Sequence, residues 1–543
     1  MGLLRRGFGA AAVLALLPAS VQAAGIVKGD AVFKRYSDKN VKRGGILRSP
    51  ILSIRGLDPH QETGDATTYV TNLTNNLLIR MNQTKTGVEP DLAKSWKQID
   101  PLTYEFKLHQ GVKFHNVPPV NGRELTSADV KYSLERMMGQ HGKPAKFKHR
   151  YYFAGRIAAI ETPDKHTVVI KTKEPYGALI NFLASSWSAI VAKEVVDKHG
   201  DLQRVAVGTG PFIMTEYVKG SHLKFRKNPD YFKKGLPYLD GIELKDAGNP
   251  AATLAGYLAG KFDITGLYFF QLKTLLEKSP DSTVTALPGS HMWTLRTPAV
   301  IPGKIPARKP FDDVRVRRAL AMAIDKEMLL KLAWGGFGET QVGPIPGSMG
   351  PWALPKSDQI QYNPEKAKKL LAEAGYPNGF TTELMTWNAP FMVKPAQVVQ
   401  GMLAKVGVKA NLKLLEFAQY FNKAYRFKYD MALHLMASAA DPEALLSPYF
   451  GSPAKSTMYK WPNKEIQDLI DEQSKILDEK KRIAMVHDIQ RKLLEDAPNV
   501  FLYTQTRYQA SRPYVHMKNY SHSLQSLLAE EWWMDKPGAS AAH

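Results

Sequence analysis

The chain has 543 residues, of which 44% are hydrophobic and 23% are charged, and its formal net charge is +22. This length is enough for about three or four domains, or for two large lobes. The sequence contains no cysteine, which excludes disulfides, cysteine–zinc sites, iron–sulfur sites and a cysteine nucleophile. The positive charge suits an anionic partner, but it carries no information about the fold.

The first 23 residues have the three parts of an export signal. Arg5 and Arg6 precede a short apolar run at residues 8–17, and small residues precede Ala24. The apolar run is too short to cross a bilayer, so we expect cleavage after Ala23. The Arg5-Arg6-Gly7-Phe8 order leaves the twin-arginine route open beside the Sec route. A lipoprotein would have cysteine at position 24, so we expect a soluble periplasmic protein that is not membrane-embedded.

Strand and helix patterns alternate along the chain. Residues 102–114 alternate apolar and polar side chains, which predicts a half-exposed strand whose buried face holds Tyr104, Phe106 and Leu108. Residues 125–137 predict a helix that is capped by Thr126 or Ser127 and buries Val130, Leu134 and Met137. This alternation favours an α/β fold.

Residues 311–330 predict a helix with Asp312 as its N-cap and one buried face. Its basic side chains are Arg315, Arg317, Arg318 and Lys326. They fit either a solvated face of the helix, which is the usual role of such charges, or a binding surface for nucleic acid.

Residues 139–153 are also basic and carry interleaved aromatic side chains. They fit either an exposed loop or a surface that stacks bases or binds an anionic chain.

Motifs for catalysis are missing from the sequence. No HExxH, GxSxG or P-loop pattern occurs, and the glycine pair Gly208 and Gly210 lacks the third glycine of a dinucleotide motif. We expect this pair to form a turn before a strand. Four histidines without metal-ligand spacing are the remaining candidates for a metal site: His60, His109, His115 and His434. We therefore predict no catalytic residues, no metal and no cofactor.

Several segments resemble, in the family's order, blocks of family 5 of the extracellular solute-binding proteins of ABC importers. The block at 310–325 reads PFDDVRVRRALAMAID, and the block at 88–116 begins VEPDLAKSW. Further matching blocks lie at residues 125–137, 207–244, 362–380 and 398–415. The resemblance covers nearly the whole mature chain, and the combination of blocks is specific.

The resemblance implies an α/β fold of the periplasmic binding protein type II-like kind, with two lobes and a hinge that the chain crosses twice. The first lobe would carry an extra small inserted domain. The implied division is domain I at 24–65, 175–285 and 506–543, domain II at 66–174, and domain III at 286–505. The proline-rich segment 296–311 departs from the family's shorter connection, and we expect it to be an extended loop.

The implied function is that of the periplasmic substrate-binding component of an ABC importer, and not that of an enzyme. Such a protein captures a peptide, or a peptide-like or anionic small solute, between its lobes and delivers it to the permease subunits. We expect a monomer that binds no nucleic acid. Two alternatives from other classes stay open: a polyanion-binding or surface-interaction protein and, with less support, a secreted hydrolase.

The resemblance also suggests ligand-binding residues. Peptide binders of the family have an aspartate, four residues before the counterpart of Pro442, that pairs with the peptide's ammonium, whereas this chain has Ser438. Asp441 is either a substitute for that aspartate or the cap of the next helix. Arg296 stands where the family commonly has asparagine, and it fits either a clamp for a carboxylate or an ordinary surface arginine. The candidates are Trp187, Trp293, Arg296, Trp387, Asn388, His434, Ser438 and Asp441. We therefore expect a cargo other than a standard free-amine peptide.

Overall fold

The structure is a computed structural model that describes residues 26–28, 40–52, 54–82, 87–287, 289, 291–298, 308–437, 439, 441–452, 461–517 and 528–535. The described residues form two compact units, and the chain passes between them at 287–288 and at 507–508. Unit A holds the described residues up to Leu287 and from Tyr508 onward, and unit B holds those between Pro288 and Arg507. In the described ranges, no helix combines the length and apolar character that a membrane span requires. The expected export signal lies outside these ranges, and the division into domains I, II and III stays a prediction.

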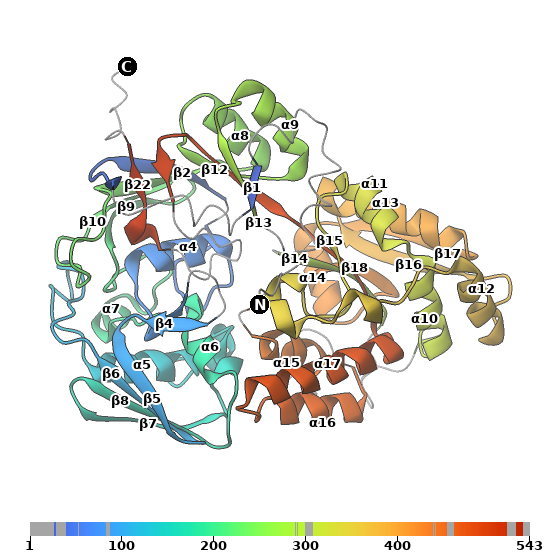
Figure 1. Ribbon diagram of the computed structural model, residues 1–543, viewed down its shortest axis with the longest axis horizontal. Helices are drawn as coiled ribbons and strands as arrows, with labels where there is room; N and C mark the ends of the chain where they lie inside the picture. Colours follow the sequence, from blue (N-terminus) through green and yellow to red (C-terminus); the bar gives the residue numbers. More distant parts are fainter. Residues whose placement is uncertain are drawn as a thin grey trace, which may run out of the picture. The chain divides into compact units, whose positions relative to one another are not determined.

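Unit A contains three four-stranded sheets (Figure 1). The first contains the strands next to both crossings, in the order β1 (Ile26–Lys28), β13 (Thr283–Leu287), β20 (Arg507–Ser511, of which Arg507 is counted with unit B) and β12 (Ile264–Leu267). The second has the order β2 (Ile46–Ile51), β11 (Gly241–Asp246), β10 (His222–Lys227) and β9 (Phe212–Val218). Fully buried apolar side chains from β2, helix α4 (Asp65–Thr74), β9, β11 and the segment 528–535 contribute to its core: Leu47, Val70, Phe212, Ile242 and Trp532.

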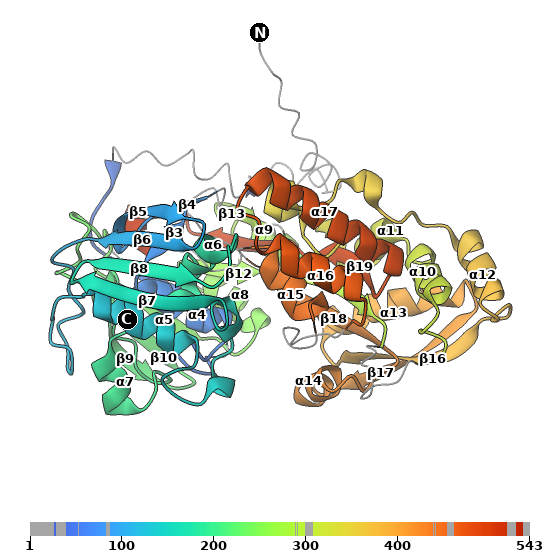
Figure 2. The ribbon, with the colours of Figure 1, turned by 90° about the horizontal axis from the view of Figure 1, so that it is seen from below.

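The third sheet of unit A has the order β5 (Ala93–Asp100), β6 (Thr103–Leu108), β8 (Thr167–Thr172) and β7 (Ile157–Asp164), side by side in Figure 2. Strand β6 buries Tyr104, Phe106 and Leu108 on one face, as the sequence predicts. Two short pairs complete the strands: β3 (Ile79–Met81) with β4 (Val88–Pro90), and β21 (Val515–His516) with β22 (Trp533–Met534). The helices are α4 (Asp65–Thr74), α5 (Ser127–Met137), α6 (Leu179–Leu183), α7 (Lys193–His199), α8 (Pro250–Leu258) and α9 (Phe269–Lys278).

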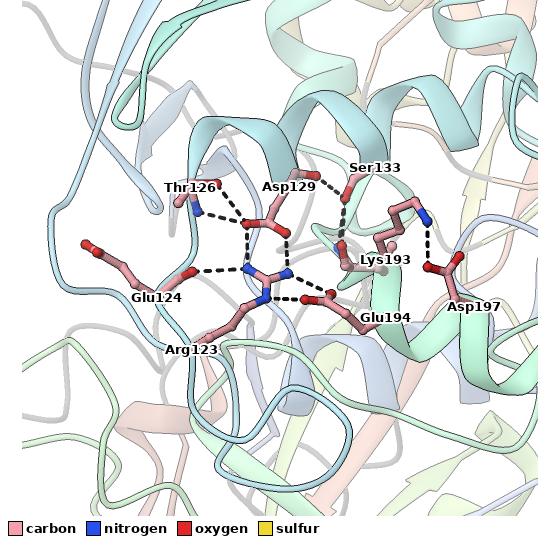
Figure 3. Close-up of polar contacts among 9 residues, drawn as sticks. Arg123, Glu124, Thr126, Asp129, Ser133, Lys193, Glu194 and Asp197 are labelled. Atoms are coloured by element: carbon pink, nitrogen blue, oxygen red, sulfur yellow. Dashed lines mark hydrogen bonds and ion pairs between the residues drawn. The ribbon is translucent and has the colours of Figure 1, made fainter.

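Helix α5 shows how local chemistry anchors these elements (Figure 3). Thr126 caps it in a capping box with Asp129, which confirms the predicted start. Arg123 donates hydrogen bonds both to Asp129 and to Glu194 at the start of α7. The predicted buried face of α5 is also confirmed, because Val130, Leu134 and Met137 are at most 1% exposed. The arginine therefore joins the starts of two helices.

The Gly208 and Gly210 pair precedes β9, as predicted. A Cβ atom at Gly208 would lie 2.3 Å from the carbonyl oxygen of Thr74, and one at Gly210 would lie 2.4 Å from the carbonyl carbon of the same residue. Both positions therefore need glycine because the backbone at the end of α4 passes directly against them.

Unit B is built on one six-stranded sheet with the order β15-β19-β14-β18-β16-β17 (Figure 1). Its strands are β15 (Glu339–Thr340), β19 (Asn499–Thr504), β14 (His291–Arg296), β18 (Met431–Ala437), β16 (Phe380–Trp387) and β17 (Val408–Leu415). Strands β16, β17 and β18 are parallel, whereas β14 runs antiparallel to both β18 and β19. Strand β19 therefore runs in the same direction as β18.

Helices cover both faces of this sheet. They are α10 (Val314–Ala323), α11 (Lys326–Trp334), α12 (Pro364–Glu373), α13 (Pro390–Ala404), α14 (Phe417–Tyr425), α15 (Glu443–Phe450), α16 (Lys464–Gln473) and α17 (Glu479–Asp496). On one face Trp334 of α11 packs edge-on against Trp293. On the other face Tyr420 of α14 packs on His434, and Tyr449 of α15 lies over Arg296. This alternation of strands and covering helices confirms the α/β expectation for unit B.

The predicted helix at 311–330 is wrong in two respects. Two helices, α10 and α11, replace it, because Ile324 has extended backbone angles and Asp325 caps the second helix. The cap of α10 is Asp313 and not Asp312, since the Asp313 side chain accepts a hydrogen bond from the amide of Arg315. The predicted solvated basic face is only partly correct: Arg315 is exposed, but Arg317 and Lys326 are each 5% exposed.

The basic segment 139–153 folds inward rather than forming an exposed loop throughout. Three of its four Phe and Tyr side chains, Phe147, Tyr152 and Phe153, are at most 4% exposed, and the fourth, Tyr151, is half-buried. The Tyr152 ring stacks on Phe182 of α6 with centroids 3.8 Å apart. These three rings are part of the core and are covered, so they do not form the base-stacking surface that was one of the two alternatives for this segment.

Candidate functional site

The candidate site in unit B is the edge of the sheet where its parallel strands end. The carboxyl ends of β16, β17, β18 and β19 meet there, together with the start of the antiparallel strand β14. Helices α13, α14 and α15 begin just after β16, β17 and β18. In open α/β sheets ligands bind outside the carboxyl ends of the strands, where helix N-termini provide partial positive charge. We call this region the carboxyl edge.

Trp387 and Asn388 lie together at the carboxyl edge. Trp387 ends β16 and is 5% exposed, whereas Asn388 is exposed and its backbone N–H donates to the carbonyl of Leu415 at the end of β17. The indole packs on Tyr420 and Phe421 of α14, with centroids 5.0 and 5.6 Å away. Asn388 therefore presents an exposed polar side chain at this edge, next to the buried Trp387.

An aromatic row on α14 begins at the carboxyl edge. Phe417, Phe421 and Tyr425 follow one another at four-residue spacing, with centroids 4.6 and 5.7 Å apart. Phe417 and Tyr425 are 46% and 47% exposed, which is unusual for large apolar rings. The sequence analysis missed this row, although the four-residue spacing directly after a strand could have indicated it.

Asp441 is held in a buried ion pair. Arg482 of α17 donates two hydrogen bonds to its carboxylate, at 2.9 and 2.6 Å, and the two side chains are 0% and 3% exposed. The carboxylate also accepts from the amide of Glu443 at the start of α15. The structure thus shows the capping role that the sequence left open for Asp441. Its partner Arg482 was missed, because 41 residues separate the two.

Ser438 lies outside the described residues, so the structure does not place the residue that stands at the family's amine-binding position. A ligand role for Ser438 stays a prediction.

Arg296 lies at the opposite edge of the same sheet. Strand β14 begins at the carboxyl edge with His291 and ends at Arg296, five residues and about 17 Å away. The guanidinium is 2% exposed and lies 5.2 Å from the centroid of the Tyr449 ring. The structure therefore separates Arg296 from Trp387 and Asn388, and it does not place Arg296 on the surface.

His434 and Trp293 are interior residues of unit B. His434 shares a hydrogen bond of 2.7 Å with the hydroxyl of Tyr420, and burial together with the charge of Arg296 holds its pKa well below the ordinary value. Trp293 is 1% exposed and stacks on Tyr503 on the other face of the sheet. Both side chains fill the interior between the sheet and its helices.

Trp187 belongs to unit A. It is 7% exposed and stacks on His149, with centroids 4.4 Å apart and planes 14° apart. Burial lowers the pKa of His149 to about 3, so this imidazole is neutral. The pair therefore contributes an apolar contact to unit A.

The four histidines considered for a metal site do not gather. The Nε2 atom of His60 bonds to the carbonyl of Ala189, and that of His115 bonds to the carbonyl of Gly210. Within the residues that the structure covers, no group of three or more His, Asp or Glu side chains could hold a metal ion.

The fold and the carboxyl edge together define an α/β solute-binding architecture, and comparisons with known proteins give the family. Residues 87–457 match the family model of bacterial extracellular solute-binding proteins, family 5 middle. The chain is 30% identical over 431 residues to the glutathione-binding protein GsiB of Pectobacterium atrosepticum, covering 76% of this chain and 79% of that protein.

Two solved structures of binding proteins share the fold. The periplasmic binding protein DppA of Helicobacter pylori, in complex with the peptide STSA, has a TM-score of 0.77 at 25% identity, covering 91% of this chain and 99% of that chain. The binding protein AgaA of A. tumefacien R10, in complex with agropinic acid, has a TM-score of 0.75 at 26% identity, with the same coverage. The chain therefore belongs to family 5 of the bacterial extracellular solute-binding proteins, with the expected type II periplasmic binding fold. It is a substrate-binding component of ABC import, a transport role that relatives perform in the periplasm.

Proposed function

We propose that this chain binds a small peptide-like solute that carries at least one carboxylate, and that it hands this solute to the permease subunits of an ABC importer. The similar proteins support this class of cargo, since one is named for glutathione and two were solved with a peptide and with agropinic acid. These three ligands share carboxylate groups and amino-acid-derived parts.

The observation that carries the proposal is the pairing of Asp441 with Arg482. Both carboxylate oxygens of Asp441 accept hydrogen bonds from the guanidinium inside unit B. Moving this carboxylate to a ligand ammonium would leave Arg482 buried without its bidentate partner, which is strongly unfavourable. Asp441 therefore does not serve as the receptor for a peptide's amino group, and the cargo is recognised through other groups.

The start of α13 supports recognition of an anionic group. This helix is 15 residues long and has no acidic residue in its first turn, and Asn388 lies directly before its N-cap. The neighbouring helix α15 has Glu443 in its first turn and Asp441 hydrogen-bonded to it. Partial positive charge at a helix start favours a carboxylate, so the start of α13 is the better receptor of the two.

The remaining parts of the proposal concern the setting of the protein. We propose that it is exported to the periplasm by the N-terminal signal, by the Sec or the twin-arginine route, and acts as a monomer. It transports its cargo without chemical change, and therefore is not an enzyme, and it binds no nucleic acid. The burial of Phe147, Tyr152 and Phe153 supports this last point, because these three rings of the basic segment are packed in the core.

Isothermal titration calorimetry with matched ligands tests the cargo. The panel pairs free-amine di- and tripeptides with their N-acetylated forms and adds glutathione, an opine and a peptide with an amidated C-terminus. We expect N-acetylation to change the Kd by less than about tenfold, since the Asp441 carboxylate is already paired with Arg482. We expect amidation of the C-terminus to weaken binding by roughly tenfold or more, because a charge-assisted interaction is lost.

The variant Asn388→Ala tests whether ligand binding can be weakened without a change in the stability of the fold. Asn388 is exposed, so this change should weaken the peptide-like ligand while the melting temperature stays within about 1 °C of the original. The matched control is Asn411→Ala, which alters an exposed asparagine within β17 of the same sheet. Acetylated ligands that bind a hundredfold more weakly than free-amine ligands would contradict the proposal, as would conversion of any ligand to a product.

A further inference from the structure

A buried polar cluster lies on one face of the unit B sheet, far along β14 from the carboxyl edge. The strand register places Arg296 opposite Asn499 of β19, and Thr294 opposite His434 of β18. Side chains on directly opposite positions of neighbouring strands point to the same face, as do residues two apart in one strand. Arg296, Thr294, Asn499 and His434 therefore share a face, and Tyr449 of α15 covers it.

Two members of this cluster have polar atoms without a partner among the described residues. Asn499 is 2% exposed, and neither its amide nitrogen nor its amide oxygen makes a hydrogen bond there. Thr294 is 0% exposed, and its hydroxyl is in the same situation. Leaving such groups unsatisfied costs about 1–3 kcal/mol each, and a bound water or ion is one of the explanations that such groups call for.

The charge within the cluster indicates what that partner is. Arg296 brings a positive charge to a position that is 2% exposed. That charge acts on two neighbouring side chains. Burial raises the pKa of Tyr429 to about 12, and the charge of Arg296 partly opposes this rise. Burial lowers the pKa of His434, and the charge of Arg296 lowers it further, so this imidazole is neutral. The cluster thus offers one cation together with the N–H donors of Asn499 and the O–H donor of Thr294, beside the Asn499 amide oxygen, which only accepts. The charge and the donors are the complement of a negative ion.

We propose that Arg296, Asn499 and Thr294 bind one small monovalent anion of the size of chloride inside unit B. The guanidinium supplies the charge, and the Asn499 amide and Thr294 hydroxyl supply further donors. Because the cluster is sealed beneath α15, the ion is a resident part of the fold and is distinct from the cargo at the carboxyl edge. The proposal does not depend on which solute the protein transports.

Crystals grown in sodium bromide give the direct test, because bromide scatters anomalously. The expected result is an anomalous peak within hydrogen-bond distance of Arg296, Asn499 and Thr294. Density at this position without an anomalous signal, which ordered water would explain fully, would overturn the proposal. A signal only on the protein surface would do the same, since it would show an adventitious ion only.

Thermal unfolding in solution gives an independent test. We compare sodium chloride with sodium gluconate at equal ionic strength, so that screening is the same in both. An ion that binds only the folded state should raise the Tm by about 3 °C for each tenfold increase of chloride above its Kd. Identical melting curves in the two salts at all concentrations would overturn the proposal.

Two variants and one matched control locate the effect. Thr294→Val and Asn499→Leu each remove a donor and should weaken chloride binding by roughly tenfold. Thr386→Val is the control, because Thr386 is equally buried, also has a hydroxyl without a partner in the described chain, and lies on the opposite face of the same sheet. It should leave the chloride dependence unchanged. If Asn499→Leu does not fold, Thr294→Val alone decides the test. Equal chloride dependence of the Tm in Thr294→Val and Thr386→Val would contradict the assigned site.

Discussion

Arg136 in unit A and Lys326 in unit B are both basic side chains inside a core, but the two regions stabilise them differently. Arg136 is 1% exposed and forms a bidentate ion pair with Asp58, at 3.0 and 2.5 Å. Lys326 is 5% exposed, and its amine donates to the backbone carbonyl of Gln341 at 2.7 Å. One region buries a cation together with its counter-ion, and the other buries an amine beside a neutral acceptor.

The protonation states follow from this difference. Burial alone would raise the pKa of Asp58, but the hydrogen bonds and charge of Arg136 hold it below its ordinary value. Burial lowers the pKa of Lys326 from 10.5 to about 7. A basic residue in a core thus keeps its charge where a carboxylate is buried with it, and loses its proton readily where only a carbonyl is present.

The largest expected effect is the loss of the carboxylate from unit A. Asp58→Asn leaves the Arg136 charge buried without its counter-ion, and we expect it to lower the free energy of unfolding by about 3–5 kcal/mol. Urea denaturation followed by circular dichroism measures this loss. The double variant Asp58→Asn with Arg136→Met should recover part of it, because the uncompensated charge is then gone. A loss below about 1 kcal/mol for the single variant would show that the pair matters little to unit A.

The opposite effect is expected in unit B. Lys326→Met replaces a poorly compensated amine with an apolar side chain of similar length, and we expect it to stabilise the protein by about 1–3 kcal/mol at pH 6. Since the folded pKa of about 7 lies below the unfolded value of 10.5, the penalty in the original protein is complete below pH 7. It declines as the pH rises to about 10, because the unfolded chain then binds more protons than the folded one.

Urea denaturation at several pH values between 6 and 10 tests the sign. The advantage of Lys326→Met should shrink steadily over this range. The control is Lys331→Met on the same helix, which alters an exposed lysine and should show no such pH dependence. A Lys326→Met protein that is less stable than the original at pH 6 would contradict the comparison of the two regions.

Sequence patterns predicted the parts of this molecule that local chemistry determines. Alternation in β6 and the capping of α5 by Thr126 depend on neighbours within a few residues, and both are present in the structure. The split of 311–330 into α10 and α11 was missed, because Asp325 acts as a cap only where Ile324 leaves the helical conformation. Periodicity alone does not reveal such a local break.

The candidate site was harder to predict because its contacts are distant in the chain. Asp441 could be recognised as a ligand or a cap from its neighbours, but its partner Arg482 is set by the packing of α17 against the start of α15. Arg296 and Trp387 both belonged to the predicted site. The antiparallel direction of β14 places Arg296 at the far edge of the sheet, and the residues themselves do not reveal the direction of a strand.

The smallest expected effect concerns an exposed ion pair, which extends the comparison from buried charges to charges on the surface. Lys193 and Asp197 form a pair along α7 at 2.5 Å, with side chains 57% and 55% exposed (Figure 3). Asp197→Asn should leave the Tm within about 1 °C of the original, because solvent screens both charges in the paired and unpaired states.

Asp129→Asn nearby should lower the Tm measurably, since Asp129 belongs to the capping box of α5 and binds Arg123. Differential scanning calorimetry compares the two variants. An equal loss in both would show that charge pairing, independent of burial, governs stability in unit A.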